Sequence, residues 1–305
     1  MSFSEIRKAY CARHYADSPQ YREADGAPTW ITRGVNIVTA VTIAEPGTTL
    51  SRKDQPDEYM LILLPGTSAR IKTAIEEMDV SGDSLSIIPP GNSEIKINEG
   101  GQVARIFTSC AKDLANQAVN AANYEGNTDH SVAPLKNWPE PANGFRIRNY
   151  PLAQYRDVHG PRIQPRTFRS TNLMVNVFVP WDTRRDPRTL SPHWHADFEQ
   201  ASLGMEGEFI HHIRYPWESD STQWQEDEHL MAGSPSVVIL PPPVIHTTID
   251  VGSGRARLID IFSPPRADFS LKPGFVLNEN DYPLPPVLQS EANQSGGSLM
   301  DWQKG

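Results

Sequence analysis

The sequence predicts an all-β fold that contains two similar β-domains and a few short helices. Three observations support this prediction. The chain has 305 residues, enough for two domains, and its 27 Pro and 20 Gly lie mostly between short apolar runs. Because Pro cannot donate to a strand ladder, such runs are typical of short strands joined by turns. Two segments of the first half also recur, in the same order, in the second half.

Each expected strand is a short run rich in Val, Ile, Phe or Thr and bounded by turn-forming residues. In chain order these runs are Val35–Ile43, Tyr59–Leu64, Leu85–Ile88, Val103–Thr108, Leu173–Val179, Gln200–Met205, Phe209–Ile213, Ser236–Leu240 and Arg257–Phe262. Two stretches without Pro or Gly predict helices: the Ala-rich segment Ala111–Tyr124, and Phe3–Tyr15 near the N-terminus.

The repeated segments define the domain organisation. Residues 57–71 resemble 198–212, because both carry an acidic residue before a strand and a Gly. Residues 81–98 resemble 232–250, because both run from a Gly through an apolar strand into a Pro-rich corner. We therefore expect five regions, which are an N-terminal arm (1–29), a first barrel (30–131), a crossover linker (132–165), a second barrel (166–285) and a C-terminal tail (286–305).

Composition narrows the functional classes. Lys and Arg total 28 against 37 Asp and Glu, and the net charge of −9 argues against nucleic acid or an anionic membrane as the main partner. The apolar stretches are too short to span a bilayer, and the N-terminus lacks the apolar core of a signal peptide. The two Cys imply no disulfide framework. We expect a cytoplasmic protein whose partner is a small-molecule substrate.

A group of potential metal ligands lies in the second half. His193 and His195 are two positions apart, so on a strand both side chains point to one face. His246 follows a Pro-rich corner and could converge on the same point. Three imidazoles and one oxygen ligand suit Fe, Mn, Ni, Zn or Cu and leave positions open for a substrate. The pattern therefore predicts one divalent transition metal per chain.

These residues resemble the two motifs of the cupin superfamily. The second motif matches through Gly233, Pro241, Pro243, His246 and Asp250, with Pro243 where Gly is usual and Asp250 where Asn is usual. The resemblance covers both halves, so the chain looks like a bicupin. It implies two jelly-roll barrels, a metal site in the C-terminal barrel and, because cupin barrels often pair through sheet edges, a homodimer.

The oxygen ligand has two candidates. The spacing to Gly207 places Gln200 at the ligand position, whereas the spacing from His195 places Glu199 there. Neighbouring residues on a strand face opposite sides, so a regular strand allows only one of them to reach the metal. We expect Gln200, and Glu199 would replace it if the strand carried a bulge.

The first half lacks this set of ligands. In the alignment of the halves, Arg52 and Asp54 occupy the His-x-His positions, Glu58–Tyr59 the oxygen-ligand position and Glu94 the position of His246. An Arg that faces two carboxylates indicates an internal ion pair rather than a transition-metal site. We expect a metal-free, structural N-terminal barrel.

Other residues of the second half could support the site. His211 and His212 follow on the next strand, one of them should point into the barrel, and we expect His212 to act as an acid/base group or to contact a ligand. Arg169 and Asn176 are candidates for anchoring a substrate carboxylate. The basic patch around Arg185 is expected to be a solvated loop.

The resemblance implies an enzyme, and three functions remain open. The first is a non-haem Fe(II) dioxygenase that acts on a small aromatic, hydroxy-acid or dicarbonyl compound. The second is a non-redox isomerase, lyase or decarboxylase of a sugar acid or hydroxy acid, with Zn, Ni or Mn as possible metals; the neutral Gln200 favours it. The third is a regulatory bicupin that binds a small molecule without catalysis. We expect the dioxygenase with Fe(II).

Overall fold

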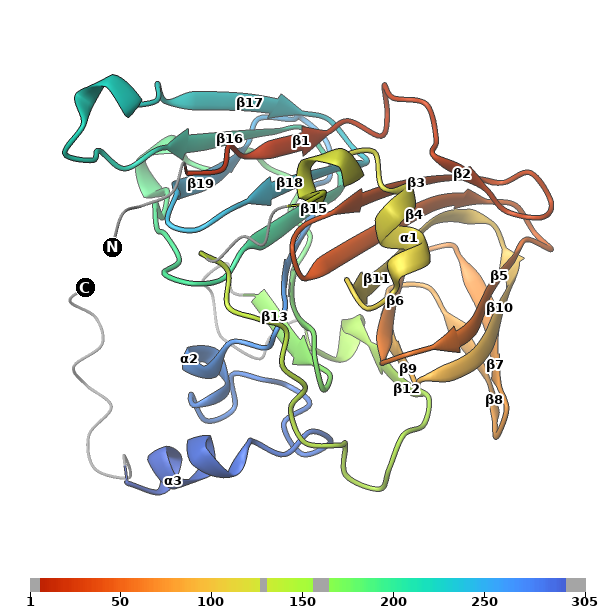
Figure 1. Cartoon of the computed structure of the whole chain (residues 1–305). Helices are drawn as coiled ribbons and strands as arrows, with labels where there is room; N and C mark the ends of the chain where they lie inside the picture. Colours follow the sequence, from red (N-terminus) through yellow and green to blue (C-terminus); the bar gives the residue numbers. More distant parts are fainter. Residues whose placement is uncertain (1–5, 127–130, 156–164, 295–305) are drawn as a thin grey trace.

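The structure is a computed structural model, and it describes residues 6–126, 131–155 and 165–294 (Figure 1). Four β-sheets and a few short helices make up the described part of the chain, which confirms the all-β prediction. Each half of the chain forms one large and one small sheet.

The first half forms a seven-stranded and a four-stranded sheet. In spatial order the large sheet consists of β12 (Arg148–Pro151), β9 (Ser84–Ile88), β6 (Tyr59–Leu63), β11 (Gly101–Thr108), β4 (Ile37–Ala44), β3 (Pro28–Arg33) and β2 (Tyr21–Arg22). The small sheet consists of β5 (Thr49–Gln55), β10 (Gly91–Glu99), β7 (Ser68–Thr73) and β8 (Glu77–Ser81).

The second half forms a six-stranded and a three-stranded sheet. The large sheet consists of β1 (Tyr10–Ala12), β18 (Ser236–Leu240), β15 (Gln200–Glu206), β20 (Arg257–Phe262), β14 (Met174–Phe178) and β13 (Pro165–Arg169). The small sheet consists of β17 (Glu228–Ala232), β16 (Phe209–Arg214) and β19 (Ile245–Asp250). The two large sheets have the same strand order, apart from the extra β2, so the repeat seen in the sequence extends strand for strand.

The largest core cluster lies between the two large sheets. Ile62 and Ile106 of the first half pack in one buried cluster with Leu203 and Ile259 of the second half. A second cluster fills the inside of the first half, between its large and small sheets. The large sheets are therefore covered on both faces, which explains why β6 and β18 are apolar along most of their length.

The two halves exchange an edge strand. β1 pairs with β18 of the second half, with Tyr10 opposite Ile239, whereas β12, which follows the first half, pairs with β9 of that half. The predicted helix Phe3–Tyr15 is therefore wrong over the described residues 6–15, where an open sheet edge offers the backbone a strand ladder. Its residues 3–5 lie outside the described part.

Helical structure is short throughout the described residues. The predicted helix Ala111–Tyr124 is confirmed only as α1 (Lys112–Gln117) and the 3-10 turn η1 (Ala121–Tyr124); it breaks where the Val119 amide donates to Ile31 O at 2.9 Å. The other helical segments are η2 (Leu152–Tyr155), η3 (Pro187–Thr189), η4 (Ser221–Gln223), α2 (Ala267–Ser270) and α3 (Pro286–Gln294). No described helix is long and apolar enough to cross a membrane.

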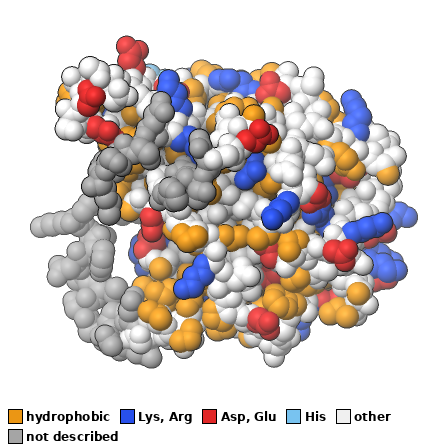
Figure 2. Space-filling view, viewed as in Figure 1, with side chains coloured by type: hydrophobic (Ala, Val, Ile, Leu, Met, Phe, Trp, Pro, Cys, Tyr) orange, Lys and Arg blue, Asp and Glu red, His pale blue; other side chains and the backbone are white. Residues whose placement is uncertain are grey.

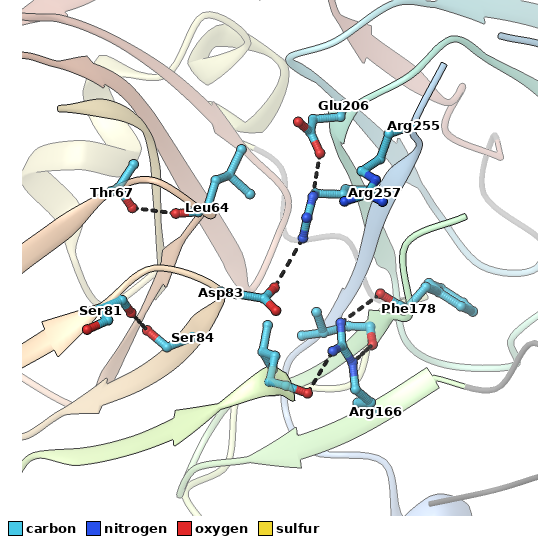
Figure 3. A network of polar contacts seen from close by, with 12 residues as sticks. Leu64, Thr67, Ser81, Asp83, Ser84, Arg166, Phe178, Glu206, Arg255 and Arg257 are labelled. Carbon is cyan, nitrogen blue, oxygen red and sulfur yellow. Dashed lines mark hydrogen bonds and ion pairs between the residues drawn. The ribbon is translucent and has the colours of Figure 1, made fainter. Parts of the chain in front are cut away.

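Charged side chains also join the two halves (Figure 3). Arg257 of β20 donates to Glu206 and forms an ion pair with Asp83 of the first half at 3.2 Å. Glu58 of the first half accepts from the backbone and hydroxyl of Thr171, both at 3.0 Å. Glu58 is therefore part of the interface between the halves.

The N-terminal arm carries a buried histidine with a pH-dependent effect on stability. Burial lowers the pKa of His14 from 6.5 to about 4, and its Nε2 bonds Thr32 Oγ1 at 2.9 Å. Because the folded pKa is below the unfolded one, stability is complete above pH 6.5 and falls as the pH drops towards 4. Between pH 8 and 4.5 the wild type should lose roughly 2–3 kcal/mol of its free energy of unfolding through protonation of His14. We expect His14→Gln to lack this part of the loss. Urea unfolding at both pH values measures this; equal losses in both proteins would contradict it.

Candidate metal centre

The three predicted histidines meet at one edge of the small sheet in the second half. His246 lies on β19, and the segment before β15 runs beside it, so that His193 N donates to His246 O at 3.1 Å and His246 N to His193 O at 2.8 Å. His195 follows two residues later, on the same side. This backbone pairing brings side chains that are distant in sequence together.

The imidazoles form a compact cluster. The ring centroids of His193 and His246 lie 4.5 Å apart, and that of His195 lies 5.0 Å and 5.1 Å from them. One possible ligand atom of each histidine lies within 4.8 Å of the others. His195 and His246 are buried, whereas His193 is exposed.

Hydrogen bonds orient the rings for a metal. His193 Nδ1 donates to Ser191 O at 2.9 Å, and His246 Nδ1 donates to Val244 O at 3.0 Å. The backbone carbonyls thereby fix the tautomer that leaves Nε2 with a free lone pair. His246 Nε2 is buried and has no hydrogen-bond partner among the described residues. An unpartnered buried acceptor beside two other imidazoles fits a divalent metal ion.

The surroundings keep the ligands uncharged. Burial lowers the pKa of His195 to about 2 and that of His246 to about 4, and neighbouring histidines add to both shifts. The ring of Phe198 stacks on His195 with centroids 4.4 Å apart. Neutral imidazole is the form that binds metals, so these two rings are ready to bind without losing a proton.

The two candidate oxygen ligands point in opposite directions. Gln200 Oε1 lies 3.0 Å from His195 Nε2, on the side of the cluster. Glu199 is buried on the other side, where its Oε1 accepts from Asn36 N of the first half at 2.8 Å. Regular strand alternation thus places Gln200, rather than Glu199, beside the histidines.

A cavity of about 140 Å³ adjoins the cluster between the two sheets of the second half. Its lining residues are Phe178, Trp181, Arg185, Ser191, His193, Gln200, Phe209, His246, Thr247, Thr248, Asp250, Leu258 and Asp260. Gln200 Nε2 donates to Ser202 Oγ at 2.9 Å, and Ser202 donates to Asp260 at 2.6 Å. Burial raises the pKa of Asp260 to about 6. The small volume suits a substrate well below drug size.

The corresponding place in the first half holds different chemistry. Arg52 pairs with Asp113 of α1 at 2.6 Å, whereas Asp54 and Glu94 are exposed, so the expected ion pair with those two carboxylates is wrong. Tyr59, the counterpart of Gln200, bonds Ser93 at 2.8 Å. The absence of a metal from this half stays a prediction.

Of the two neighbouring histidines, one points into the second half as expected, but it is His211 rather than His212. His211 is buried inside and bonds Thr248 Oγ1 at 2.9 Å, and burial lowers its pKa to about 3. His212 points to the outer face of β16, where its Nδ1 lies 2.8 Å from His229 Nδ1. The interpretation of His212 as a group beside the metal ligands is therefore wrong, because strand alternation turns it away.

Neither predicted carboxylate anchor lines the cavity. Arg169 donates to the backbone oxygens of Tyr282 and Pro283 and lies over the Trp138 ring, so it holds the C-terminal segment in place. Asn176 lies directly opposite Asp260 and on the same face of the large sheet, but its Oδ1 accepts from Thr167 at 2.8 Å. Neither position supports the anchoring role.

Arg185 is the site residue that sequence reasoning missed. The segment that carries it runs along β19, and its guanidinium lines the cavity and donates to Thr248 O at 2.9 Å and Ser191 Oγ at 3.1 Å. The sequence predicted that Arg185 lies in a solvated loop rich in Arg and Asp. Of that patch, Arg188 is exposed and pairs with Asp186, but Arg185 turns inward.

No protein-family model matches the chain, and no curated protein sequence matches it. Solved structures of oxalate decarboxylase are similar in three dimensions. One, concerned with substrate binding and a reaction-specificity switch, has a TM-score of 0.56 at 12% identity, over 89% of this chain and 82% of that chain. A mutant of the Bacillus subtilis enzyme gives 0.54 at 13%, over 89% and 82%. A structure concerned with the Mn(II) centres of the Bacillus subtilis enzyme gives 0.55 at 12%, over the same shares. These likenesses show the cupin fold, as the motifs predicted.

Proposed function

We propose that this bicupin is a metal-dependent enzyme that performs non-redox chemistry, of the decarboxylase or lyase type, on a small carboxylic acid. The observation that carries the proposal is the cavity beside the histidine cluster, where Arg185 and Asp260 come from different walls. A divalent metal held by His193, His195, His246 and Gln200 would polarise a substrate carbonyl or carboxylate.

Arg185 supports an anionic substrate. Among the described residues, no carboxylate forms an ion pair with it, and burial lowers its pKa because no nearby negative charge offsets the loss of water. Its guanidinium donates to a hydroxyl and to two backbone carbonyls, which leaves N–H groups for a further acceptor. A substrate carboxylate in the cavity would accept from this guanidinium and fix the orientation of the substrate.

The position of Asp260 favours a reaction with proton transfer over a reaction with O2. Its carboxyl faces the cavity and is held by Ser202, which in turn is held by Gln200. Asp250, the other carboxyl of the lining, already accepts from Trp181 Nε1 and Gly252 N. Asp260 is thus the group that could give a proton to the substrate or take one from it. The structures similar to this chain are of oxalate decarboxylase, and one concerns its Mn(II) centres, which supports decarboxylation and Mn(II) over the Fe(II) dioxygenase expected from sequence.

The test compares reaction types directly. The chain is loaded with Mn(II) and incubated without oxygen with a panel of small dicarboxylic, hydroxy- and keto-acids, and CO2 release and products are followed by mass spectrometry and NMR. Turnover without oxygen is expected. Substrate-dependent oxygen uptake would instead assign the dioxygenase, and bound metal with bound acid but no turnover would assign a binding protein.

Replacing Arg185 tests the substrate anchor. We expect Arg185→Met to lower kcat/KM for the acid by roughly 30- to 1,000-fold, because a charge-assisted anchor inside a cavity is worth on the order of 2–4 kcal/mol. Arg188→Met is the matched control, since Arg188 is exposed and pairs with Asp186 in the same segment. Steady-state kinetics of both variants measures the effect. Equal kcat/KM values for Arg185→Met and Arg188→Met would show that Arg185 does not bind the substrate.

A further inference from the structure

The outer face of the small sheet in the second half carries a second group of ligand-type side chains. His212 of β16 lies directly opposite His229 of β17 on one side and Thr247 of β19 on the other. Directly opposed residues of antiparallel strands point to the same face, so the three side chains form one row across the sheet. A hollow of about 200 Å³ opens over this row, and Pro192 and Ile245 lie among its lining residues.

The two imidazoles of this row share a hydrogen bond. The Nδ1 atoms of His212 and His229 lie 2.8 Å apart, and the ring centroids 4.8 Å. Such a contact needs one donor and one acceptor, so a single hydrogen lies between the two nitrogens. Two nitrogens bound to one zinc ion at about 2.0–2.1 Å each are separated by roughly 3.0–3.4 Å. If this pair opens slightly and the shared hydrogen moves to Nε2 of its own ring, both Nδ1 lone pairs become available to one metal ion.

Thr247 provides an independent sign of a ligand. Thr247 is 9% exposed and is one of the residues that line the hollow, and its Oγ1 is buried without a hydrogen-bond partner among the described residues. An unpartnered buried hydroxyl costs free energy unless something else binds it. A metal ion with its bound water, held by the neighbouring His212, would satisfy that hydroxyl.

The local charges favour a cation. Arg214, the one basic side chain that lines the hollow apart from the histidines, is paired with Asp227 at 2.6 Å. Burial lowers the pKa of His212, and the nearby His229 adds to this shift, so its lone pair is available near neutral pH. Figure 2 shows acidic side chains on the protruding connection between β16 and β17, which contains Glu218, Asp220 and Glu226. The field there attracts cations.

We propose that His212, His229 and Thr247 form a second site for a divalent transition-metal ion such as Zn(II). The site is distinct from the histidine cluster, because the side chains of the neighbours Thr247 and His246 point to opposite faces of β19, although the two sites adjoin and His246 also borders the hollow. It has two imidazoles where the cluster has three, so it binds metal more weakly and exchanges it with the solvent.

The test is a titration of the metal-stripped full chain with Zn(II) by isothermal calorimetry. We expect the wild type to bind two equivalents, and His212→Gln and His229→Gln to bind one each. His246→Ala should lose the tighter equivalent and keep the weaker one. His14→Gln removes a histidine elsewhere and should still bind two. Thr247→Val keeps the shape and should weaken the second equivalent at least severalfold.

Three results would overturn the proposal. They are a single equivalent bound by the wild type, a second equivalent that survives in both His212→Gln and His229→Gln, and unchanged affinity in Thr247→Val. Circular dichroism of each variant checks that the fold is intact. Because the two equivalents are lost in different variants, failure of this site and failure of the histidine cluster are distinguishable.

Discussion

Replacing His246 with alanine is expected to remove metal from the proposed centre in the second half and to abolish the proposed turnover. The expected loss of affinity exceeds about 100-fold, since changes to residues that merely support metal ligands already cost 10–100-fold. The physical reason is geometric: His246 Nε2 is a buried acceptor without a hydrogen-bond partner in the described part of the chain, and its ring lies 4.5 Å from that of His193. Elemental analysis of the protein after gel filtration measures the effect.

The variant needs a control for folding, because His246 is buried and its backbone pairs with His193. Circular dichroism and the midpoint of urea unfolding serve this purpose. Ser263→Ala, which alters a buried residue outside the cluster, should keep full metal content. Full metal content in His246→Ala would contradict the metal centre itself.

The second large effect is expected from a residue of the first half. A Cβ added to Gly34 would lie 2.2 Å from Glu199 Oε1, and its three nearest atoms all belong to the carboxylate of Glu199. That carboxylate is 1% exposed and accepts from Asn36 N, so it has little room to move. We expect Gly34→Ala to destabilise the fold by about 2–4 kcal/mol through overpacking and displacement of the buried Glu199 carboxylate.

The same change should also lower metal content, because Glu199 directly precedes Gln200, the first residue of β15, and a shift of the first moves the second. Urea unfolding and elemental analysis measure both effects. Gly254→Ala is the control, since a Cβ there meets nothing within 4 Å. Combining Gly34→Ala with Glu199→Ala should restore part of the stability by making room for the methyl group. No recovery in the double variant would show that the cost arises elsewhere.

Local patterns explain what could be predicted from sequence. Alternation along an extended chain predicts that His193 and His195 share a side and that Gln200 and Glu199 do not, and the spacing to Gly207 selected Gln200; neither argument needs knowledge of distant contacts. The repeat of 81–98 in 232–250 has the same local origin, and it survives as β9 and β18 at equivalent places in their sheets. Those features follow from neighbours within a few residues of one another.

Where the sequence predictions were wrong, the structure depends on contacts between residues that are far apart in the sequence. β1 is a three-residue strand that exists because β18 offers it an edge, and nothing within residues 6–15 encodes that partner. Arg52 finds Asp113 on α1 rather than the nearby Asp54. Arg185 enters the cavity because its irregular segment follows β19, whereas its sequence neighbours are solvent-facing charges. For a long side chain with several possible partners, tertiary packing determines which partner it contacts.

The exchange of β1 and β12 has a consequence for the chain as a whole. Each strand precedes one half and completes the sheet of the other, at equivalent edges, since Ile239 faces Tyr10 and Ile87 faces Arg148. This is the arrangement of a domain-swapped dimer joined into one polypeptide. Neither half expressed alone would have its full set of strands, and each would expose a bare edge prone to pairing with other chains. A cut between the halves, by contrast, should leave two fragments that stay together.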